Sequence, residues 1–387
     1  MLHFKNNSIH QETDCVISQK LFDIAYSCIK TWDAYCPTPL HHLNGLAESL
    51  GVKQIYYKDE SKRFGLKSFK ALGGAYAVAC VLRLHLNKIL PNDDIQNKDI
   101  LAGKYSEILK EFTVATATDG NHGRSVAWGA QQCGIKCYIY MHKAVSKNRA
   151  ISVEKFGAKV VWVDGNYDDS LVMVKRDATR NKWQIISDTS YAGYTDVPKY
   201  VMAGYTVMTH EIFKQLNNCV IPTHIIIQGG VGGLAASICA HASALWGSQR
   251  PKFIVVEPET ADCLYQSAML GEPKMVHIEK ETLMGGLSCG EVSLIGWDIL
   301  KNNTNDFITI SDDNVRPAMR LMAKGVSEDP SIEAGESAVA GIATLMELKN
   351  LSTIKSELNI DKNSRILLFG TEGATDQNMY DQIVTGA

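Results

Sequence analysis

The chain has 387 residues, of which 45% are hydrophobic, and this length suits two closely joined globular domains with a substantial core. Its 39 lysines and arginines nearly balance its 42 aspartates and glutamates, so no overall field would attract nucleic acid or an anionic membrane surface. The N-terminus lacks the apolar core of a signal peptide, and apolar runs such as 234–246 are too short to span a bilayer. We therefore expect a cytoplasmic protein that acts on small molecules.

The ten cysteines follow no spacing that would indicate a disulfide framework. Cys133 and Cys137 form an isolated C-x-x-x-C pair with no second pair of ligands nearby, whereas a structural zinc site needs four clustered ligands. We expect buried thiols and no metal site.

Short β-rich apolar runs alternate with longer amphipathic stretches from residue 53 onward. The predicted strands are 54–58, 113–116, 137–141, 159–163, 184–187, 223–227, 252–257 and 365–369, and the predicted helices are 69–86, 121–132, 146–156, 167–181 and 233–245. The polar interruption 87–110 predicts a surface loop with one short helix. Strands that alternate with helices indicate an α/β protein with mostly parallel sheets flanked by helices.

Lys70 begins the first long predicted helix in a setting that suits a reactive amine. Phe69 and Leu72 flank it, and the small residues 73–75 would let a flat ring approach the backbone. A lysine must be partly deprotonated to attack an aldehyde, and burial lowers its pKa by disfavouring the charged form. Most lysines are solvated surface charges, so Lys70 alone does not identify a site.

A glycine-rich turn joins the strand 223–227 to the helix that follows, and consists of Gly229, Gly230, Val231, Gly232, Gly233 and Leu234. Glycines free backbone N–H groups to face a phosphate, and the helix N-terminus adds a favourable dipole. A tight strand-to-helix turn without a ligand and a dinucleotide site are the alternatives. The spacing is not G-x-G-x-x-G, and Glu257 fits the strand-ending acid of such a site only loosely.

A second strand-to-helix connection contains Thr118, Asp119, Gly120, Asn121, His122 and Gly123. Its backbone amides can receive a carboxylate, and the Asn121 amide can bond to a phenolic oxygen. Alternatively, Asp119 or Asn121 caps the helix, and the two interpretations are compatible. His122 taken alone is more typical of a structural histidine.

In this order, the lysine and the two loops resemble those of the tryptophan synthase β family of pyridoxal phosphate enzymes, known as fold type II. Within it, the chain is most similar to the diaminopropionate ammonia-lyases, from Tyr35 to Asp376, with landmarks at 58–65, 118–124, 286–291 and 335–337. The resemblance implies that Lys70 is the Schiff-base lysine, that Gly230 to Leu234 bind the phosphate, that Thr371 faces the pyridine nitrogen, and that the enzyme is a homodimer.

The resemblance also implies two acids. Asp119 stands where serine and threonine dehydratases carry serine, and a carboxylate there would attract a β-ammonium group and assist its departure. Asp188 would be the second acid, so that one site accepts both D- and L-2,3-diaminopropionate and produces pyruvate and two ammonia. A capping or turn aspartate is the alternative for Asp188.

The predicted large domain combines 1–70 and 192–387, the small domain is 71–191, and the resemblance places the cofactor in the cleft that they form. Cys263 and Cys289 fall in segments that resemble loops close to the site, which suggests a disulfide between them. A serine or threonine dehydratase and a catalytically silent cofactor-binding homologue remain the alternative functions.

Overall fold

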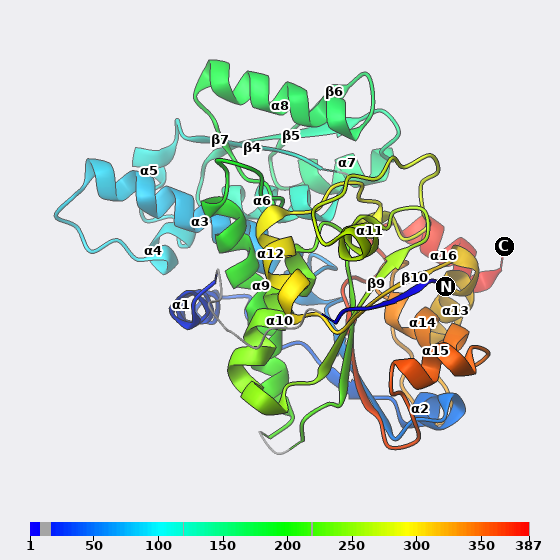
Figure 1. Cartoon of the computed structure of the whole chain (residues 1–387). Coiled ribbons are helices and arrows are strands. Elements are labelled where there is room, and N and C mark those ends of the chain that lie inside the picture. Colours follow the sequence, from blue (N-terminus) through cyan, green and yellow to red (C-terminus); the bar gives the residue numbers. More distant parts are fainter. Residues whose placement is uncertain (8–16, 119, 218–219, 387) are drawn as a thin grey trace. The chain divides into compact units, whose positions relative to one another are not determined.

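The computed structural model describes residues 1–7, 17–118, 120–217 and 220–386, which are coloured along the chain in Figure 1. Two compact units divide the chain. The first unit comprises Met1–Gln19, Pro37–Arg63 and Met208–Ala387, and the second comprises Lys20–Cys36 and Phe64–Val207. The second unit is thus longer at both ends than the predicted small domain 71–191. Aromatic packing accounts for the N-terminal part, because the Trp32 ring lies 5.3 Å from Phe64 and 5.7 Å from Trp128.

Among the described residues, the first unit contains a seven-stranded sheet with the strand order β1-β10-β9-β8-β11-β3-β2. Its inner strands are parallel, and only the two edge strands β1 and β2 run antiparallel to their neighbours. The strands are β1 (His3–Lys5), β2 (Leu40–His42), β3 (Gln54–Asp59), β8 (His224–Gln228), β9 (Lys252–Pro258), β10 (Asp306–Ile310) and β11 (Arg365–Gly370). The central strands are apolar on both faces, as expected of parallel strands that helices cover on both sides.

Helices cover both faces of this sheet. One face packs into the main hydrophobic core with α2 (Asn44–Leu50), α13 (Val315–Lys324), α14 (Ala340–Leu348), α15 (Ser352–Glu357) and α16 (Gln377–Thr385). Figure 1 shows α10 (Gly233–Trp246) and α12 (Leu294–Asn303) on the opposite face. The helix α11 (Cys263–Leu270) follows β9, and α9 (Asp196–Gln215) contributes its C-terminal part to this unit.

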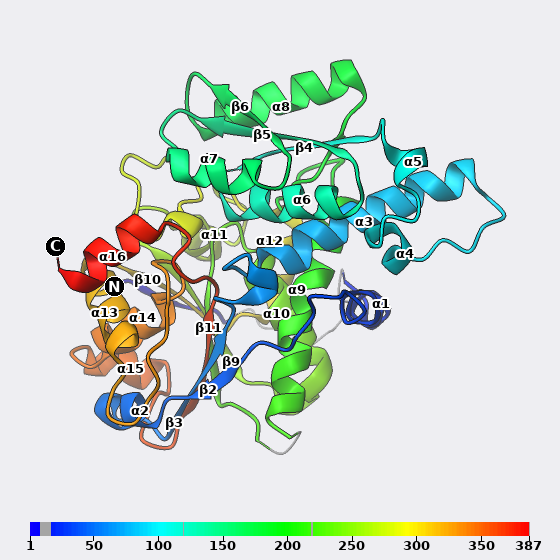
Figure 2. The same ribbon diagram turned by 180° about the vertical axis from the view of Figure 1, so that it is seen from behind.

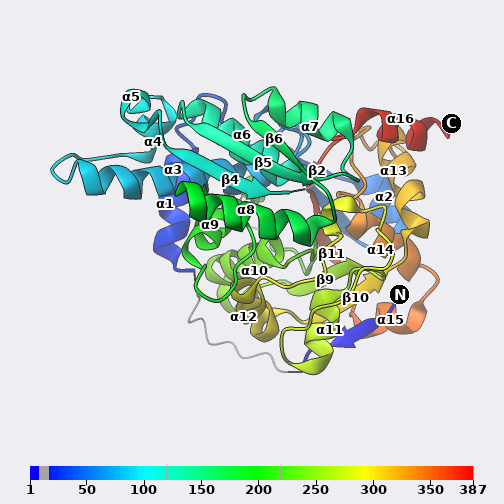
Figure 3. The ribbon, with the colours of Figure 1, turned by 90° about the horizontal axis from the view of Figure 1, so that it is seen from above.

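The second unit is built on a parallel sheet with the strand order β6-β5-β4-β7. Its strands are β4 (Thr113–Ala117), β5 (Lys136–His142), β6 (Lys159–Val163) and β7 (Gln184–Ile185). The helix α8 (Tyr167–Asn181) covers one face, and α6 (Asn121–Gln132) and α7 (Lys147–Glu154) cover the other, as Figure 3 shows from above.

The helix α3 (Lys70–Ile89) lies directly on α6, which is clear from behind in Figure 2. Two glycines permit the close approach. A Cβ on Gly129 would lie 2.7 Å from the Cα of Ala75, and one on Gly74 would clash with the Ser125 hydroxyl. The other helices of this unit are α1 (Gln19–Ile29), α4 (Asn97–Leu101), α5 (Ser106–Leu109) and the N-terminal part of α9. Short 3₁₀ turns occur at Arg63–Gly65, Gly247–Gln249, Gly285–Leu287 and Asp312–Asn314.

The predicted α/β fold with two mostly parallel sheets is confirmed. One detail was wrong: residues 90–110, all of which the structure describes, contain two short helices, α4 and α5, instead of one. The segment also starts later than expected, because α3 continues to Ile89. Within the described residues, no helix combines the length and apolar character needed to cross a membrane.

Candidate active site

In the second unit, Lys70 is the first residue of α3 and lies among aromatic rings. Its Nζ lies 5.3 Å from the centre of the Phe69 ring and 5.8 Å from that of Tyr205. The Ser68 hydroxyl accepts a hydrogen bond from the Lys70 backbone N–H at 3.2 Å, which fixes the start of the helix. Only 23% of the Lys70 side chain is exposed, so the amine is largely shielded from water but still reachable.

Asp188 lies against this amine. The Nζ of Lys70 donates to Oδ2 of Asp188 at 2.6 Å, so the two residues form a partly buried ion pair. Burial acts to raise the pKa of Asp188, but the charge of Lys70 and the hydrogen bond from Lys70 hold it well below its ordinary value. Asp188 is therefore a carboxylate at neutral pH and can accept a proton.

His122 is the third member of this group. Its Nε2 donates to the backbone carbonyl of Ile186 at 2.8 Å, because a carbonyl can only accept, and its Nδ1 lies 3.8 Å from Oδ2 of Asp188. Burial lowers the pKa of His122, and the opposing effect of Asp188 does not restore it. The ring is therefore neutral, and the lone pair of Nδ1 is on the side of Asp188.

The loop before α6 is organised by Thr118. Its hydroxyl oxygen accepts from the N–H groups of Gly120 at 3.1 Å and Gly123 at 3.3 Å. Any side chain on Gly123 would collide with the Thr118 methyl group, where a Cβ would lie 2.3 Å away. Asn121 is the first residue of α6, and Gly120 is the N-cap, so the expected cap by Asn121 was wrong. Asp119, the other predicted cap and a predicted acid, lies outside the described residues.

In the first unit, the glycine-rich turn leads from β8 into α10. Gly230 and Gly232 have φ values of 57° and 94°, a region that favours glycine. The first N–H groups of α10, from Gly233 and Leu234 onward, have no acceptor within the helix, and the helix dipole makes this end positive. The turn is therefore suited to an anion such as a phosphate group.

Thr371 lies at the same edge of this sheet. It follows β11, which pairs with β8 in parallel, so both strands end at the edge from which the glycine-rich turn departs. Thr371 is 4% exposed. Ligands of open α/β sheets bind at the carboxyl ends of neighbouring strands, and Thr371 and the turn share that position.

Glu257, the strand-ending acid considered for a dinucleotide site, is engaged by the first turn of α11. Its carboxylate oxygens accept from the N–H groups of Leu264 and Tyr265 at 3.0 and 2.7 Å, so it caps α11 instead of facing a ribose. Burial raises the pKa of Glu257 to about 8, although the two N–H donors oppose this rise. The carboxyl group is then mostly neutral near pH 7, and does not repel an anion on the neighbouring turn.

The expected disulfide between Cys263 and Cys289 is absent, because both are free thiols. Both are nevertheless close to the glycine-rich turn. The Cys263 thiol lies 3.7 Å from the Gly230 carbonyl oxygen, and Cys289 Sγ would lie 3.7 Å from a Cβ placed on Gly230. Burial raises the pKa of Cys263, and the nearby Glu257 adds to the rise, so this thiol stays protonated.

Known proteins share this architecture and sequence. The family model described as pyridoxal-phosphate dependent enzyme matches residues 31–368. The diaminopropionate ammonia-lyase of Escherichia coli (strain K12) is 36% identical over 98% of this chain and 95% of its own length. The enzyme of the same name from Salmonella typhimurium is 40% identical over 90% of this chain and 88% of its own length. The chain belongs to the diaminopropionate ammonia-lyase family of pyridoxal-phosphate dependent enzymes.

A crystal structure of the Escherichia coli ammonia-lyase with an aminoacrylate-PLP azomethine reaction intermediate has a TM-score of 0.89 to this chain at 35% identity, and the match covers 99% and 96% of the two chains. As a member of the ammonia-lyase family, this chain uses pyridoxal phosphate. Its residues fit the cofactor, because the glycine-rich turn offers N–H groups to a phosphate and Lys70 offers an amine to an aldehyde.

Sequence reasoning missed one neighbour of Lys70 and the structural role of one loop residue. Tyr205 lies on Lys70 but is far along the chain on α9, and nothing in its local sequence marks it. Thr118 was predicted as a substrate contact, but its role in holding the loop came only from the structure. A serine or threonine two or three residues before a helix is the signal that would have indicated it.

Proposed function

We propose that the protein catalyses α,β-elimination of both D- and L-2,3-diaminopropionate, with one water consumed and pyruvate and two ammonia released. The ion pair of Lys70 and Asp188 supports this most directly, because it brings an amine and a proton acceptor within 2.6 Å of each other. The names of the relatives support the choice of substrate.

Pyridoxal phosphate, when bound, supplies an electron sink for the pair released when the α-proton leaves. The chain supplies the proton transfers. We propose that Asp188 takes the α-proton of one enantiomer and Asp119 that of the other. Asp119 would also pair with the β-ammonium group and help it leave protonated, because amine is otherwise a poor leaving group.

The remaining predicted residues hold and orient the reactants. In this proposal Gly229 to Leu234 bind the phosphate, Asn121 bonds to the phenolic oxygen, and Thr371 faces the ring nitrogen. A hydroxyl at the ring nitrogen leaves it largely unprotonated, which suits elimination better than transamination. The amides of the loop 118–122 would receive the substrate carboxylate, since N–H groups bind carboxylates strongly.

We further propose that the enzyme is a homodimer in the cytoplasm. The free thiols among the described cysteines suit a reducing compartment. Light scattering of the purified protein would test the dimer, with the mass of one chain, 42.6 kDa, as the unit.

The purified protein mixed with D-diaminopropionate, L-diaminopropionate, serine or threonine tests the proposal, with formation of the 2-oxo acid as the readout. We expect rapid pyruvate formation from both diaminopropionate enantiomers and at most slow turnover of the hydroxy amino acids. Preferred turnover of serine or threonine would instead indicate a dehydratase. Bound cofactor absorbance without any turnover would indicate the silent homologue.

A further inference from the structure

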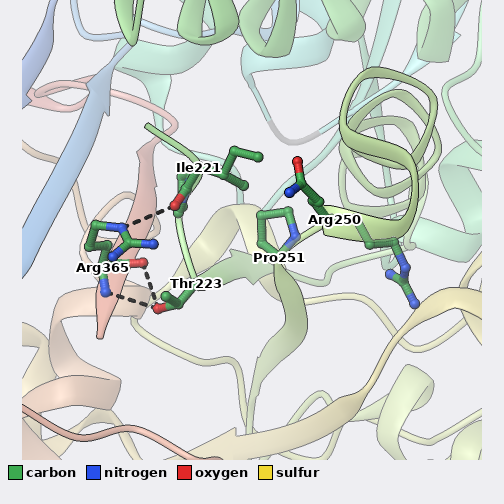
Figure 4. Close-up of a pocket in the computed structure, with 7 residues that line it drawn as sticks. Ile221, Thr223, Arg250, Pro251 and Arg365 are labelled. Atoms are coloured by element: carbon green, nitrogen blue, oxygen red, sulfur yellow. Dashed lines mark hydrogen bonds between the residues drawn. The ribbon is translucent and has the colours of Figure 1, made fainter. Parts of the chain in front are cut away.

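A side chain that bonds to the backbone of another segment can hold that segment in place. Figure 4 shows such a case in the first unit, where Arg365 lines a cavity of about 490 Å³ and donates to the Ile221 carbonyl at 3.1 Å. Arg250 lines the same cavity and donates to the Asn303 carbonyl at 2.8 Å. These bonds fix the chain before β8 and at the end of α12, so they serve the fold of that unit.

Bonds of this kind also hold the segment that carries Asp188 in the second unit. Asp188 follows β7, and the hydroxyl of Tyr194 bonds to the chain before it twice. It donates to the Ile185 carbonyl at 2.9 Å and accepts from the Ser187 N–H at 3.0 Å. A hydroxyl has one proton and two lone pairs, so a single oxygen can make both bonds. The Tyr194 hydroxyl therefore bridges the end of β7 and the residue directly before Asp188.

The residue between the two bridged positions is fixed as well. The Ile186 N–H donates to the Ala115 carbonyl of β4 at 2.9 Å, and the Ile186 carbonyl accepts from Nε2 of His122 at 2.8 Å. The three consecutive residues 185–187 are thus bonded at their backbones to other parts of the second unit. The main chain has little freedom at the point where Asp188 begins.

Tyr194 is itself firmly held. Its ring stacks on that of Tyr191, with 4.9 Å between the ring centres and 14° between the planes. The Tyr191 N–H donates to the Tyr194 carbonyl at 3.3 Å, and the reverse bond is 2.9 Å long. Gly193 closes this turn with a φ of 82°, and Nζ of Lys175 lies 4.3 Å from the centre of the Tyr191 ring. Burial raises the pKa of Tyr194, so the hydroxyl keeps the proton that it donates.

We propose that Tyr194 is a positioning residue, which holds the carboxylate of Asp188 against the Lys70 amine through the backbone of 185–187. The proposal rests on the proposed function, in which Asp188 takes the α-proton of one enantiomer of diaminopropionate. A base must lie within hydrogen-bond reach of the proton that it takes, and Asp188 lies 2.6 Å from the Lys70 amine. Tyr194 bonds to the backbone, so it acts through the place of the acid and not on the substrate.

Tyr194→Phe removes both bonds of the bridge and keeps the ring. For the enantiomer whose turnover depends on Asp188, kcat should fall by about tenfold to a hundredfold, because a displacement of about 1 Å can cost that much in rate. The other enantiomer should react at close to the wild-type rate. Asp188→Ala, measured in the same series, identifies the dependent enantiomer. General destabilisation would lower the turnover of both enantiomers, so the difference between them reports on positioning.

Hydrogen exchange of the holoenzyme, followed by mass spectrometry, gives a readout that does not depend on turnover. Without the bond to the Ser187 N–H, the amides of 186–189 should exchange about threefold to tenfold faster in Tyr194→Phe. Tyr191→Phe is the matched control, since it keeps the same stack and its hydroxyl makes no hydrogen bond to another described residue. It should match the wild type in exchange and in turnover of both enantiomers.

Ser187→Ala tests the same segment if Tyr194→Phe folds poorly. The Ser187 hydroxyl oxygen accepts from the Thr189 N–H at 3.1 Å, so it spans Asp188 and forms the next link after the bridge. Its loss should lower kcat for the same enantiomer by about threefold to tenfold. Unchanged turnover of that enantiomer would mean that the backbone on either side of Asp188 does not hold the acid, which overturns the proposal.

Two results from Tyr194→Phe would also overturn it: equal turnover losses, or none, for the two enantiomers, and amide exchange as slow as in the wild type. Both leave the proposed elimination intact as long as Asp188→Ala impairs one enantiomer. If Asp188→Ala impairs neither enantiomer, the role of Asp188 in the proposed function is wrong, and the role of Tyr194 fails with it.

Discussion

Two groups of charged residues, one in each unit, differ in how completely their charges are paired. In the first unit, Arg63 is buried and donates to Glu60 at 2.7 and 2.9 Å and to Glu211 at 2.9 and 2.8 Å. Lys58 forms a further ion pair with Glu211 at 2.7 Å, and the Thr38 hydroxyl donates to Glu60. This cluster has little capacity left for a ligand.

The second group, Lys70 with Asp188 and His122, is more exposed and less saturated. The exposed fractions of Lys70 and Asp188 are 23% and 16%, against 1% for Arg63. The Nδ1 of His122 and the hydroxyl of Tyr205 are buried without a hydrogen-bond partner among the described residues. Burial of charge alone therefore does not indicate function. Unused hydrogen-bonding capacity beside a reachable charge does, since fully paired networks serve mainly to fix the fold.

The largest expected effect is the loss of activity when Lys70 is replaced. Lys70→Ala should reduce kcat/KM by a factor of about 10³ or more, because the covalent attachment and a proton-transfer group are lost together. The folded protein should remain. Borohydride reduction of the wild type followed by peptide mapping should label Lys70, and Lys88→Ala, at an exposed position of the same helix, is the control. A label on another lysine would refute the assignment.

A substitution in the fully paired cluster around Arg63 should lower the stability of the protein and not its activity. Arg63→Met leaves Glu60 and Glu211 buried without their main partner, which should cost about 3–5 kcal/mol of unfolding free energy. Burial opposes the charge of Arg63, but the two glutamates raise its pKa above the ordinary value, so Arg63 is charged in the folded protein. Urea unfolding measures the loss. A variant as stable as the wild type would show that the cluster contributes nothing to the fold.

Asp119 and Asp188 should differ in the enantiomer of diaminopropionate on which each acts. Asp119→Ser should lose on the order of a hundredfold in diaminopropionate turnover, as expected of a general acid-base group, while cofactor absorbance survives. Asp188→Ala should affect one enantiomer far more than the other. The measurement is kcat/KM for both enantiomers in both variants. Equal losses for D and L in each variant would contradict the division of roles.

The neutral histidine predicts a pH effect on stability. The folded-state pKa of His122 lies below 6.5, so the unfolded state binds more protons as the pH falls. The contribution of His122 to stability should therefore decrease as the pH falls through about 6.5, and level off below the folded-state pKa. Urea unfolding of the wild type and His122→Asn between pH 5 and pH 8 (about the range in which histidine titrates) gives this difference. A difference that does not vary with pH would mean that His122 has the same pKa in the folded and unfolded states.

The smallest effect concerns Tyr205. Its hydroxyl has no close hydrogen-bond partner in the described part of the chain, so Tyr205→Phe removes at most a weak contact with the Lys70 amine. We expect a change in unfolding free energy within about 0.5 kcal/mol, or a slight gain. Thermal unfolding checks this, and a loss above about 1 kcal/mol would mean that the hydroxyl is paired in solution.

The local sequence was sufficient to predict those features whose pattern lies within one short stretch of the chain. The glycine-rich turn lies between β8 and α10 as predicted, because an apolar strand, a run of glycines and a helix are all read within one stretch. Strands such as β3, β9 and β11 were found through their continuous apolar runs. The edge strands β1 and β2 were not, because three residues are too few to show a pattern.

What the sequence by itself determined is the fold class, the position of Lys70 at a helix start and the glycine-rich turn between a strand and a helix, since each depends on neighbours in the chain. Only the tertiary structure decided that Asp188 lies on Lys70, 118 residues away, that Tyr205 covers the same amine, and that Cys263 and Cys289 are free. Such contacts join distant segments, and their partners follow from how helices and strands pack, which no local pattern specifies.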